Sequence, residues 1–117
     1  MMSSSICVQL QFELIHCWPK APTEVLYLRS RHRHMAHVRA EIEVFDDDRE
    51  LEFIMVKHYL ERWIDTDKEC WDISISCEQI AKKVLAVLQS KYGDHRDITV
   101  SVFEDGENGA VVKYTKN

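Results

Sequence analysis

The sequence predicts an α+β fold in which two helices cover one face of a four-stranded antiparallel sheet. Apolar and polar residues alternate in two segments of the N-terminal half and again near the C-terminus. Between these regions, apolar residues recur every three or four positions. A period of two is typical of a strand with one buried face, and the longer period is typical of a helix. The expected order is therefore strand, strand, helix, helix, strand, strand.

The two N-terminal strands are separated by a proline-containing segment. The first alternating run covers residues 6–14, and His16 continues its apolar parity. Two prolines in residues 19–22 end this pattern, because proline has no backbone N–H to donate to a sheet. The second run, residues 32–44, leads to an acidic turn at Asp46-Asp47-Asp48. Both runs predict strands with one buried face.

Two helices are expected in the middle of the chain. Apolar residues have helical spacing from Phe53 to Ile64, and the polar residues 65–75 are expected to connect this helix to the next. Ser76 followed by Gln79 is a capping box, which predicts the start of the second helix. Gly93 predicts its end.

The C-terminal residues predict a hairpin. Residues 98–104 and 110–114 alternate on either side of a turn at residues 105–109. A four-stranded sheet of this kind has two unpaired edges, which favour pairing between copies of the chain. We therefore expect a homo-oligomer.

Length and composition restrict the class of protein. With 117 residues, of which 45% are apolar and 30% charged, the chain is expected to form one domain over residues 1–117. The formal charge of −5 argues against nucleic-acid binding, which needs a basic surface. No apolar run approaches the roughly 18–20 residues that span a membrane. Four cysteines without a C-x-x-C pair predict free thiols and a cytoplasmic location.

The strongest chemical pattern is His32-Arg33-His34 in the second strand. Residues two apart in a strand project from the same face, so both imidazoles could bind one metal ion at about 2.0–2.1 Å. His16 has the same core-facing parity, and antiparallel pairing could place it opposite this pair. Three neutral nitrogen ligands leave one position open, as in catalytic zinc sites. The pattern predicts a Zn²⁺ site formed by His16, His32 and His34.

Two other interpretations of these histidines stay open. Arg29, Arg31 and Arg33 surround the pair, as in a solvated basic loop, and they could also bind a phosphate or carboxylate. Alternatively, hydrogen bonds alone could satisfy the imidazoles. Burying three of them without partners on an apolar face would be unfavourable.

Several segments resemble motifs of the 6-pyruvoyl-tetrahydropterin synthase and 6-carboxytetrahydropterin synthase family. The segment from Phe12 to His16 is similar to the family's first histidine motif, and His32-Arg33-His34 is similar to its H-G-H motif. Further similar segments follow in the family's order over nearly the whole chain: Leu51-Glu52-Phe53 with Val56-Lys57, Ser76 to Ala81, Val100 to Glu104, and Gly109-Ala110-Val111.

The resemblance implies a T-fold, a zinc site with three histidine ligands and a pterin pocket between subunits. It also implies that Glu104 anchors the amino-pyrimidine edge of the pterin. A carboxylate is suited to this role because it can accept two parallel N–H bonds. The alternative for Glu104 is an acid that only flanks the turn at Asp105-Gly106.

The sequence departs from the family where proton transfer would take place. The residues before His32 contain no cysteine, although the family has one there. The shortened segment from Trp63 to Cys70 also lacks the family's Asp-His pair. Cys17 and Cys70 are the candidates for a proton-transferring group, and the alternative is that both thiols are inert.

The expected function is a zinc-dependent pterin lyase acting on a dihydroneopterin triphosphate-type substrate. One alternative is a non-catalytic T-fold protein that binds a pterin or a purine. A zinc-free domain with hydrogen-bonded histidines is a third possibility.

Overall fold

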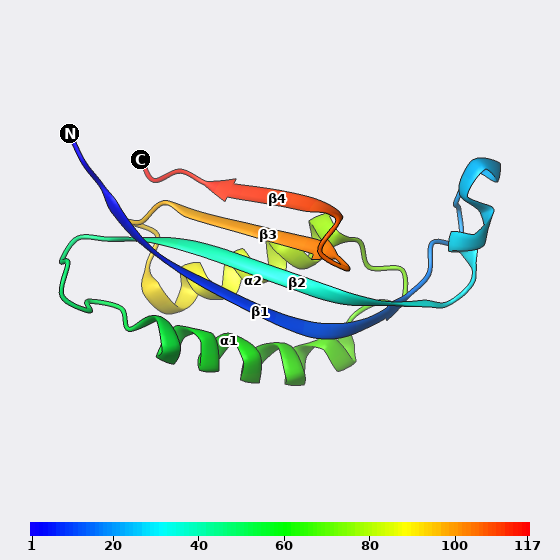
Figure 1. Cartoon of the computed structure of the whole chain (residues 1–117), viewed down its shortest axis with the longest axis horizontal. Coiled ribbons are helices and arrows are strands. Elements are labelled where there is room, and N and C mark those ends of the chain that lie inside the picture. Colours follow the sequence, from blue (N-terminus) through cyan, green and yellow to red (C-terminus); the bar gives the residue numbers. More distant parts are fainter.

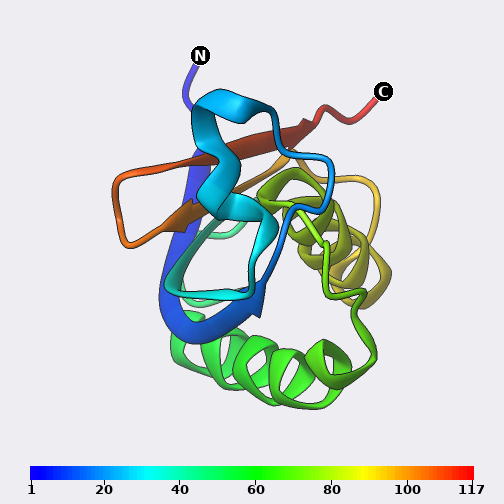
Figure 2. The ribbon, with the colours of Figure 1, turned by 90° about the vertical axis from the view of Figure 1, so that its right-hand side faces the viewer.

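The strands and helices follow one another in the predicted order. The computed structural model describes residues 1–117. It contains strands β1 (Ser4–His16), β2 (His32–Val44), β3 (Ile98–Glu104) and β4 (Asn108–Tyr114), and helices α1 (Phe53–Asp67) and α2 (Cys77–Tyr92). The antiparallel sheet has the order β1-β2-β3-β4, and both helices lie on the same side of it (Figures 1 and 2). This β-β-α-α-β-β arrangement is that of a T-fold.

The core lies between the sheet and the two helices. Alternate residues of the strands point toward the helices, α1 packs against β1, and α2 packs against β3 and β4. Burying one Val, Leu or Ile side chain contributes about 1.5–3 kcal/mol, so this interface drives the fold. Neither helix is long and apolar enough to cross a membrane. Helix residues in the core include Val56, Leu60, Ile64, Ile80, Val84 and Leu88.

Some element boundaries differ from the predicted ones. The first helix continues to Asp67, beyond the predicted start of a connection at residue 65, and a short 3₁₀ segment, Lys68–Cys70, follows it. No glycine or proline occurs there to end the helix earlier. A 3₁₀ segment at Thr23–Arg29, which was not predicted, follows Pro22. Strand β4 begins at Asn108, two residues earlier than expected.

The start of α2 is set by the predicted capping box. The Ser76 amide donates to Gln79 Oε1 at 2.9 Å, and the Gln79 amide donates to Ser76 Oγ at 3.2 Å. At the other end, Gly93 has a φ of +102°, which favours glycine. The capping box fixes the rotational phase of the helix, and thereby directs Cys77 toward the core.

A buried ionic network holds the end of the sheet near the two chain termini. Arg96 donates to the backbone carbonyl of Glu43 at 3.0 Å and pairs with the Glu50 carboxylate at 2.6 Å. Lys116 contacts both carboxylate oxygens of Glu43 at 2.8 Å. The hydrogen bond from Lys116 is the largest cause of a lowered pKa for Glu43. This network ties the C-terminal residues to β2, far from the predicted histidine site.

The β3–β4 hairpin depends on a close approach at Gly109. A Cβ atom on this residue would lie 1.9 Å from the carbonyl oxygen of Val102. We expect Gly109→Ala to lower the free energy of unfolding by about 1–3 kcal/mol or more, because the strands must separate to admit the methyl group. Urea unfolding measures this. Val111→Ala, at a half-exposed position of the same strand, is the control and should change stability much less. Equal stability of the two variants would contradict the predicted clash.

Candidate metal centre

Strand pairing brings the three predicted histidines together. His16 lies opposite His32 in the register of β1 and β2, and Leu14 lies opposite His34. The end of β1 and the start of β2, where these histidines lie, are at the end of the sheet opposite the chain termini (Figure 1). The ring centroids are 4.5 Å apart for His16 and His32, 4.8 Å for His32 and His34, and 5.3 Å for His16 and His34. This places the three rings around one small space.

Each of these imidazoles has one nitrogen engaged by an acceptor. In all three rings this nitrogen is Nδ1, which must therefore carry the proton and donate it. Nε2 is then the ring nitrogen left to bind a metal ion. Metal-binding histidines typically have such an acceptor on the other ring nitrogen. The acceptors for His16, His32 and His34 are, in order, the carbonyl oxygens of Ile75 and Ser30, each at 2.9 Å, and the carboxylate of Asp105 at 2.7 Å.

The Nε2 atoms of the imidazoles give the best indication of a metal site. Nε2 of His16 and Nε2 of His34 are buried and have no hydrogen-bond partner. Leaving such atoms unsatisfied is unfavourable unless something else binds them. Ligand atoms of His16, His32, His34 and Glu104 all lie within 4.8 Å of one another. The residues therefore fit a divalent cation, and nitrogen-rich ligand sets of this kind suit zinc, copper, iron and nickel.

Glu104 reaches this cluster from the end of β3. Its Oε2 atom lies 2.5 Å from Nε2 of His34 and 3.6 Å from Nε2 of His16. The shorter contact does not have hydrogen-bond geometry, because Nε2 of His34 remains without a hydrogen-bond partner. Glu104 lies on the core-facing side of the sheet, since its partner in β2 is the fully buried Ala36.

A cavity of about 410 Å³ opens beside the imidazoles. Its volume is within the range of small-molecule sites, about 300–1,000 Å³. The wall combines imidazoles and a carboxylate with aromatic and small residues. The lining residues are His16, Trp18, Tyr27, Leu28, His32, His34, Ser76, Cys77, Glu78, Glu104, Asn108 and Gly109.

Cys77 is a residue of this cavity that the sequence analysis did not select. Its Sγ atom lies 3.6 Å from Oε1 of Glu104. Burial, followed by the Glu104 charge, raises the pKa of the thiol to about 12. The sequence did contain a signal for Cys77. The capping box sets the start of α2, and Cys77 is one turn before Ile80 and Ala81, so it lies on the buried face of the helix.

The other residues proposed from the sequence lie elsewhere. Cys17 is half-buried and Cys70 is exposed, and neither lines the cavity. Arg29 donates to the carbonyl oxygen of Ala21 at 2.8 Å, and Arg31 lines a different hollow. Arg33 pairs with Glu13 on the opposite face of the sheet.

Asp105 is a second residue that was not recognised as part of the site. Its φ of 55° lies in the left-handed region, which Asp tolerates better than most residues. This turn lets one carboxylate oxygen accept from the Met35 amide at 2.9 Å and the other accept from His34. The hydrogen bond from His34 is the largest cause of the lowered pKa of Asp105.

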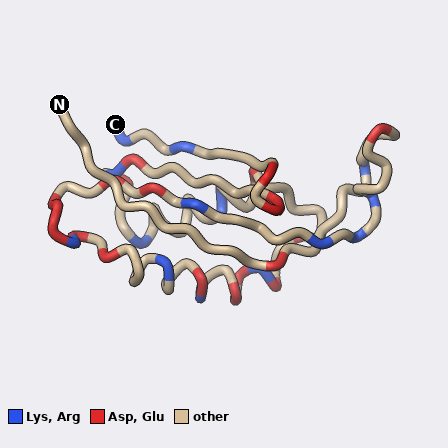
Figure 3. The backbone as a smooth tube through the Cα atoms, in the orientation of Figure 1, with Lys and Arg blue, Asp and Glu red and all other residues tan.

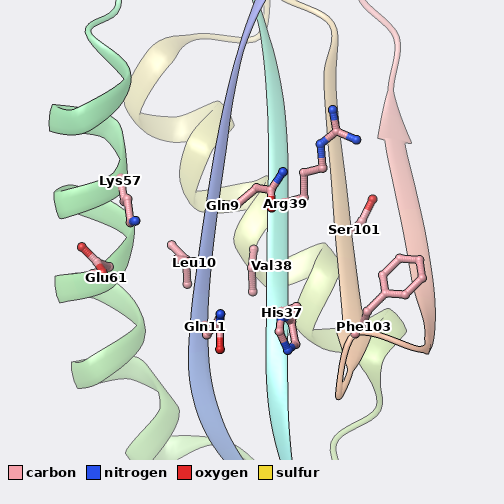
Figure 4. Close-up of a pocket in the computed structure, with 11 residues that line it drawn as sticks. Gln9, Leu10, Gln11, His37, Val38, Arg39, Lys57, Glu61, Ser101 and Phe103 are labelled. Carbon is pink, nitrogen blue, oxygen red and sulfur yellow. The ribbon is translucent and has the colours of Figure 1, made fainter.

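A larger hollow, of about 650 Å³, lies on the other face of the sheet (Figure 4). It contains none of the proposed site residues. Arg39, one of its cations, is already paired with Glu41 at 2.9 Å. Lys and Arg are interspersed with Asp and Glu along the chain (Figure 3). The residues labelled in Figure 4 include Gln9, Gln11, His37, Arg39, Ser101 and Phe103 from the strands, and Lys57 and Glu61 from α1.

Comparison with known proteins adds no assignment to this geometry. The sequence matches no protein-family model, and it has no match among curated proteins.

Asp105 should determine how tightly the histidines hold a metal ion. We expect Asp105→Gly to weaken zinc binding by about 10–100-fold, the usual effect of removing an outer-sphere partner. Glycine is chosen because it accepts the positive φ. Asp105→Asn keeps an acceptor oxygen and should weaken binding less. Competition with a chromogenic chelator measures the affinity, with Glu107→Gln in the same turn as the control. Unchanged affinity in Asp105→Gly would contradict this role.

Cys77 should be the least reactive thiol of the metal-free protein. A rise in pKa from 9.0 to about 12 lowers its thiolate fraction about 1,000-fold at neutral pH. With a disulfide reagent at pH 8, exposed Cys7 and Cys70 should react first, and Cys77 only after denaturation. Cys77→Ser should remove only the slowest phase. Rapid labelling of all four thiols in the native protein would contradict the predicted pKa.

Proposed function

We propose that this protein is a zinc-dependent lyase of the 6-pyruvoyl-tetrahydropterin synthase type, acting on a dihydroneopterin triphosphate-type pterin. The observation that supports this most is the convergence of three histidines whose Nδ1 atoms are engaged by other acceptors and whose Nε2 atoms are left for a metal, two of them buried without a partner. Structural zinc sites are usually closed by thiolates, whereas catalytic sites keep a position for a ligand. The adjoining cavity gives such a ligand a place to bind.

The chain's own residues would bind and orient the substrate. Glu104 presents a carboxylate at the cavity wall, where it can accept two N–H groups from the amino-pyrimidine edge of a pterin. Trp18 and Tyr27 line the same cavity and offer apolar surface to a planar ring. When bound, zinc would supply a Lewis acid that polarises a carbonyl or hydroxyl oxygen.

A specific observation favours a second candidate, a T-fold protein that binds a pterin or purine without catalysis. Proton transfer needs a positioned group whose pKa suits the working pH. Cys17 and Cys70 do not line the cavity, and the pKa of Cys77 is raised to about 12. The general base of the lyase therefore has no assigned residue.

In this proposal the protein is a cytoplasmic homo-oligomer. Strands β1 and β4 are the two edges of the sheet, and their outer backbone groups are available for pairing with another copy. Such pairing would extend the sheet and leave the histidine cavity near a subunit boundary, since β1 ends in His16 and β4 contributes Gly109 to the cavity.

Metal content is the first test. We expect about one zinc per chain in untagged protein, and nearly none in His32→Ala or His34→Ala, because each variant leaves only two imidazoles. Elemental analysis after removal of excess metal measures this. His58→Ala, on the exposed surface of α1, is the control and should retain zinc. Absence of zinc from the wild-type protein, even after zinc is added, would contradict the lyase proposal.

The two candidate functions differ in turnover. The zinc-loaded lyase should consume 7,8-dihydroneopterin triphosphate and release inorganic triphosphate, and His34→Ala should not. Binding of the pterin without turnover would support the non-catalytic candidate and reject the lyase.

A further inference from the structure

Glu104 lies closer to the histidines than it would need to if it only bound the substrate. Its Oε2 atom is in contact with Nε2 of His34 and lies 3.6 Å from Nε2 of His16. Nδ1 of both rings is already engaged by another acceptor, so Nε2 is the nitrogen that each imidazole presents to the carboxylate oxygen. Imidazole nitrogens and a carboxylate oxygen grouped this closely form a donor set that suits one divalent cation.

The contact between Glu104 and His34 is close but is not a hydrogen bond, since Nε2 of His34 has no hydrogen-bond partner. The ligand atoms of Glu104 and of the three histidines lie within 4.8 Å of one another, as the ligands of one ion do. In a tetrahedral site with bonds of 2.0–2.1 Å, ligand atoms are about 3.3 Å apart. The 3.6 Å separation between Glu104 Oε2 and His16 Nε2 is close to this value, whereas the 2.5 Å separation from His34 Nε2 is shorter, so the carboxylate would shift slightly when an ion binds.

The second carboxylate oxygen has its own contact. Oε1 of Glu104 lies 3.6 Å from Sγ of Cys77, and the thiol donates to it. The Glu104 side chain is 30% exposed, so it is accessible from the cavity and is not locked in the core. It can therefore rotate away from the imidazoles while its contact with α2 is kept.

We propose that Glu104 is the fourth ligand of the cation held by His16, His32 and His34, so that the resting metal site is closed. This inference rests on the proposed function and adds a step to it. A ligand entering the cavity has to release Glu104 before the fourth position opens. The released carboxylate is then free to accept the N–H groups of that ligand. Recognition of the ring and opening of the metal site are thus coupled through one side chain.

Cobalt substitution tests this without measuring turnover. Co²⁺ reports its ligand geometry through visible absorption, and azide is a small anion that binds only where a coordination position is open. In the wild-type Co²⁺ protein, azide should leave the spectrum nearly unchanged at millimolar concentrations. In Glu104→Ala, the spectrum should change on removal of the ligand and should respond to azide. Zinc binding should weaken by at least the 10–100-fold that an outer-sphere loss causes.

Matched variants make the result specific to Glu104. Glu78→Gln removes a carboxylate from the same cavity wall and should behave as the wild-type protein does. Glu104→Gln, which keeps the side-chain size, serves if the alanine variant is poorly folded by circular dichroism, and it should also admit azide.

The outcomes separate the two proposals. An azide response of equal size in wild-type protein and Glu104→Ala overturns the closed site but leaves the three-histidine metal site intact. Failure of the wild-type protein to bind either Co²⁺ or Zn²⁺ overturns both.

Discussion

The two-residue period of side chains in β1 and β2 is the constraint on which the site depends. The parity that buries Val38 and Ile42 under the helices also carries His32 and His34 onto the same face. Antiparallel register then sets His16 directly opposite His32. A shift of one residue in this register would move the histidines to the other face and expose the core. The hydrophobic core and the histidine cluster are therefore specified by one pattern, and neither can change register alone.

The rest of the molecule supplies acceptors that hold the imidazoles in one tautomer. These come from three different connections: the residues before α2, the segment before β2 and the β3–β4 turn. Ile75, Ser30 and Asp105 each engage one Nδ1 atom. The direction of each Nε2 atom is consequently fixed without an ion, which would reduce the reorganisation that binding an ion requires. The short connections matter to the chemistry as much as the strands do.

Much of the site follows from local patterns in the sequence. Alternation alone places His16, His32, His34 and Glu104 on one face, and the capping box at Ser76 would place Cys77 there as well. The orienting partners do not follow in this way. Backbone carbonyls carry no residue signature, so Ile75 and Ser30 could have been any residues. Asp105 acts through a left-handed φ that an Asp-Gly turn permits but does not require. The extension of α1 to Asp67 was missed because its last turn is polar and leaves no periodic signal.

The crowding of imidazole nitrogens and a carboxylate also affects the stability of the chain itself. Without a cation, the native state leaves two of these nitrogens buried without a partner, whereas the unfolded chain hydrates each of them. A cation that binds only the native state then shifts the folding equilibrium, by about 2.7 kcal/mol at a free concentration 100 times its dissociation constant. If the site binds a metal ion, metal supply would in this way raise the stability of the fold. Under metal scarcity a larger fraction of the chain would be unfolded and open to proteolysis.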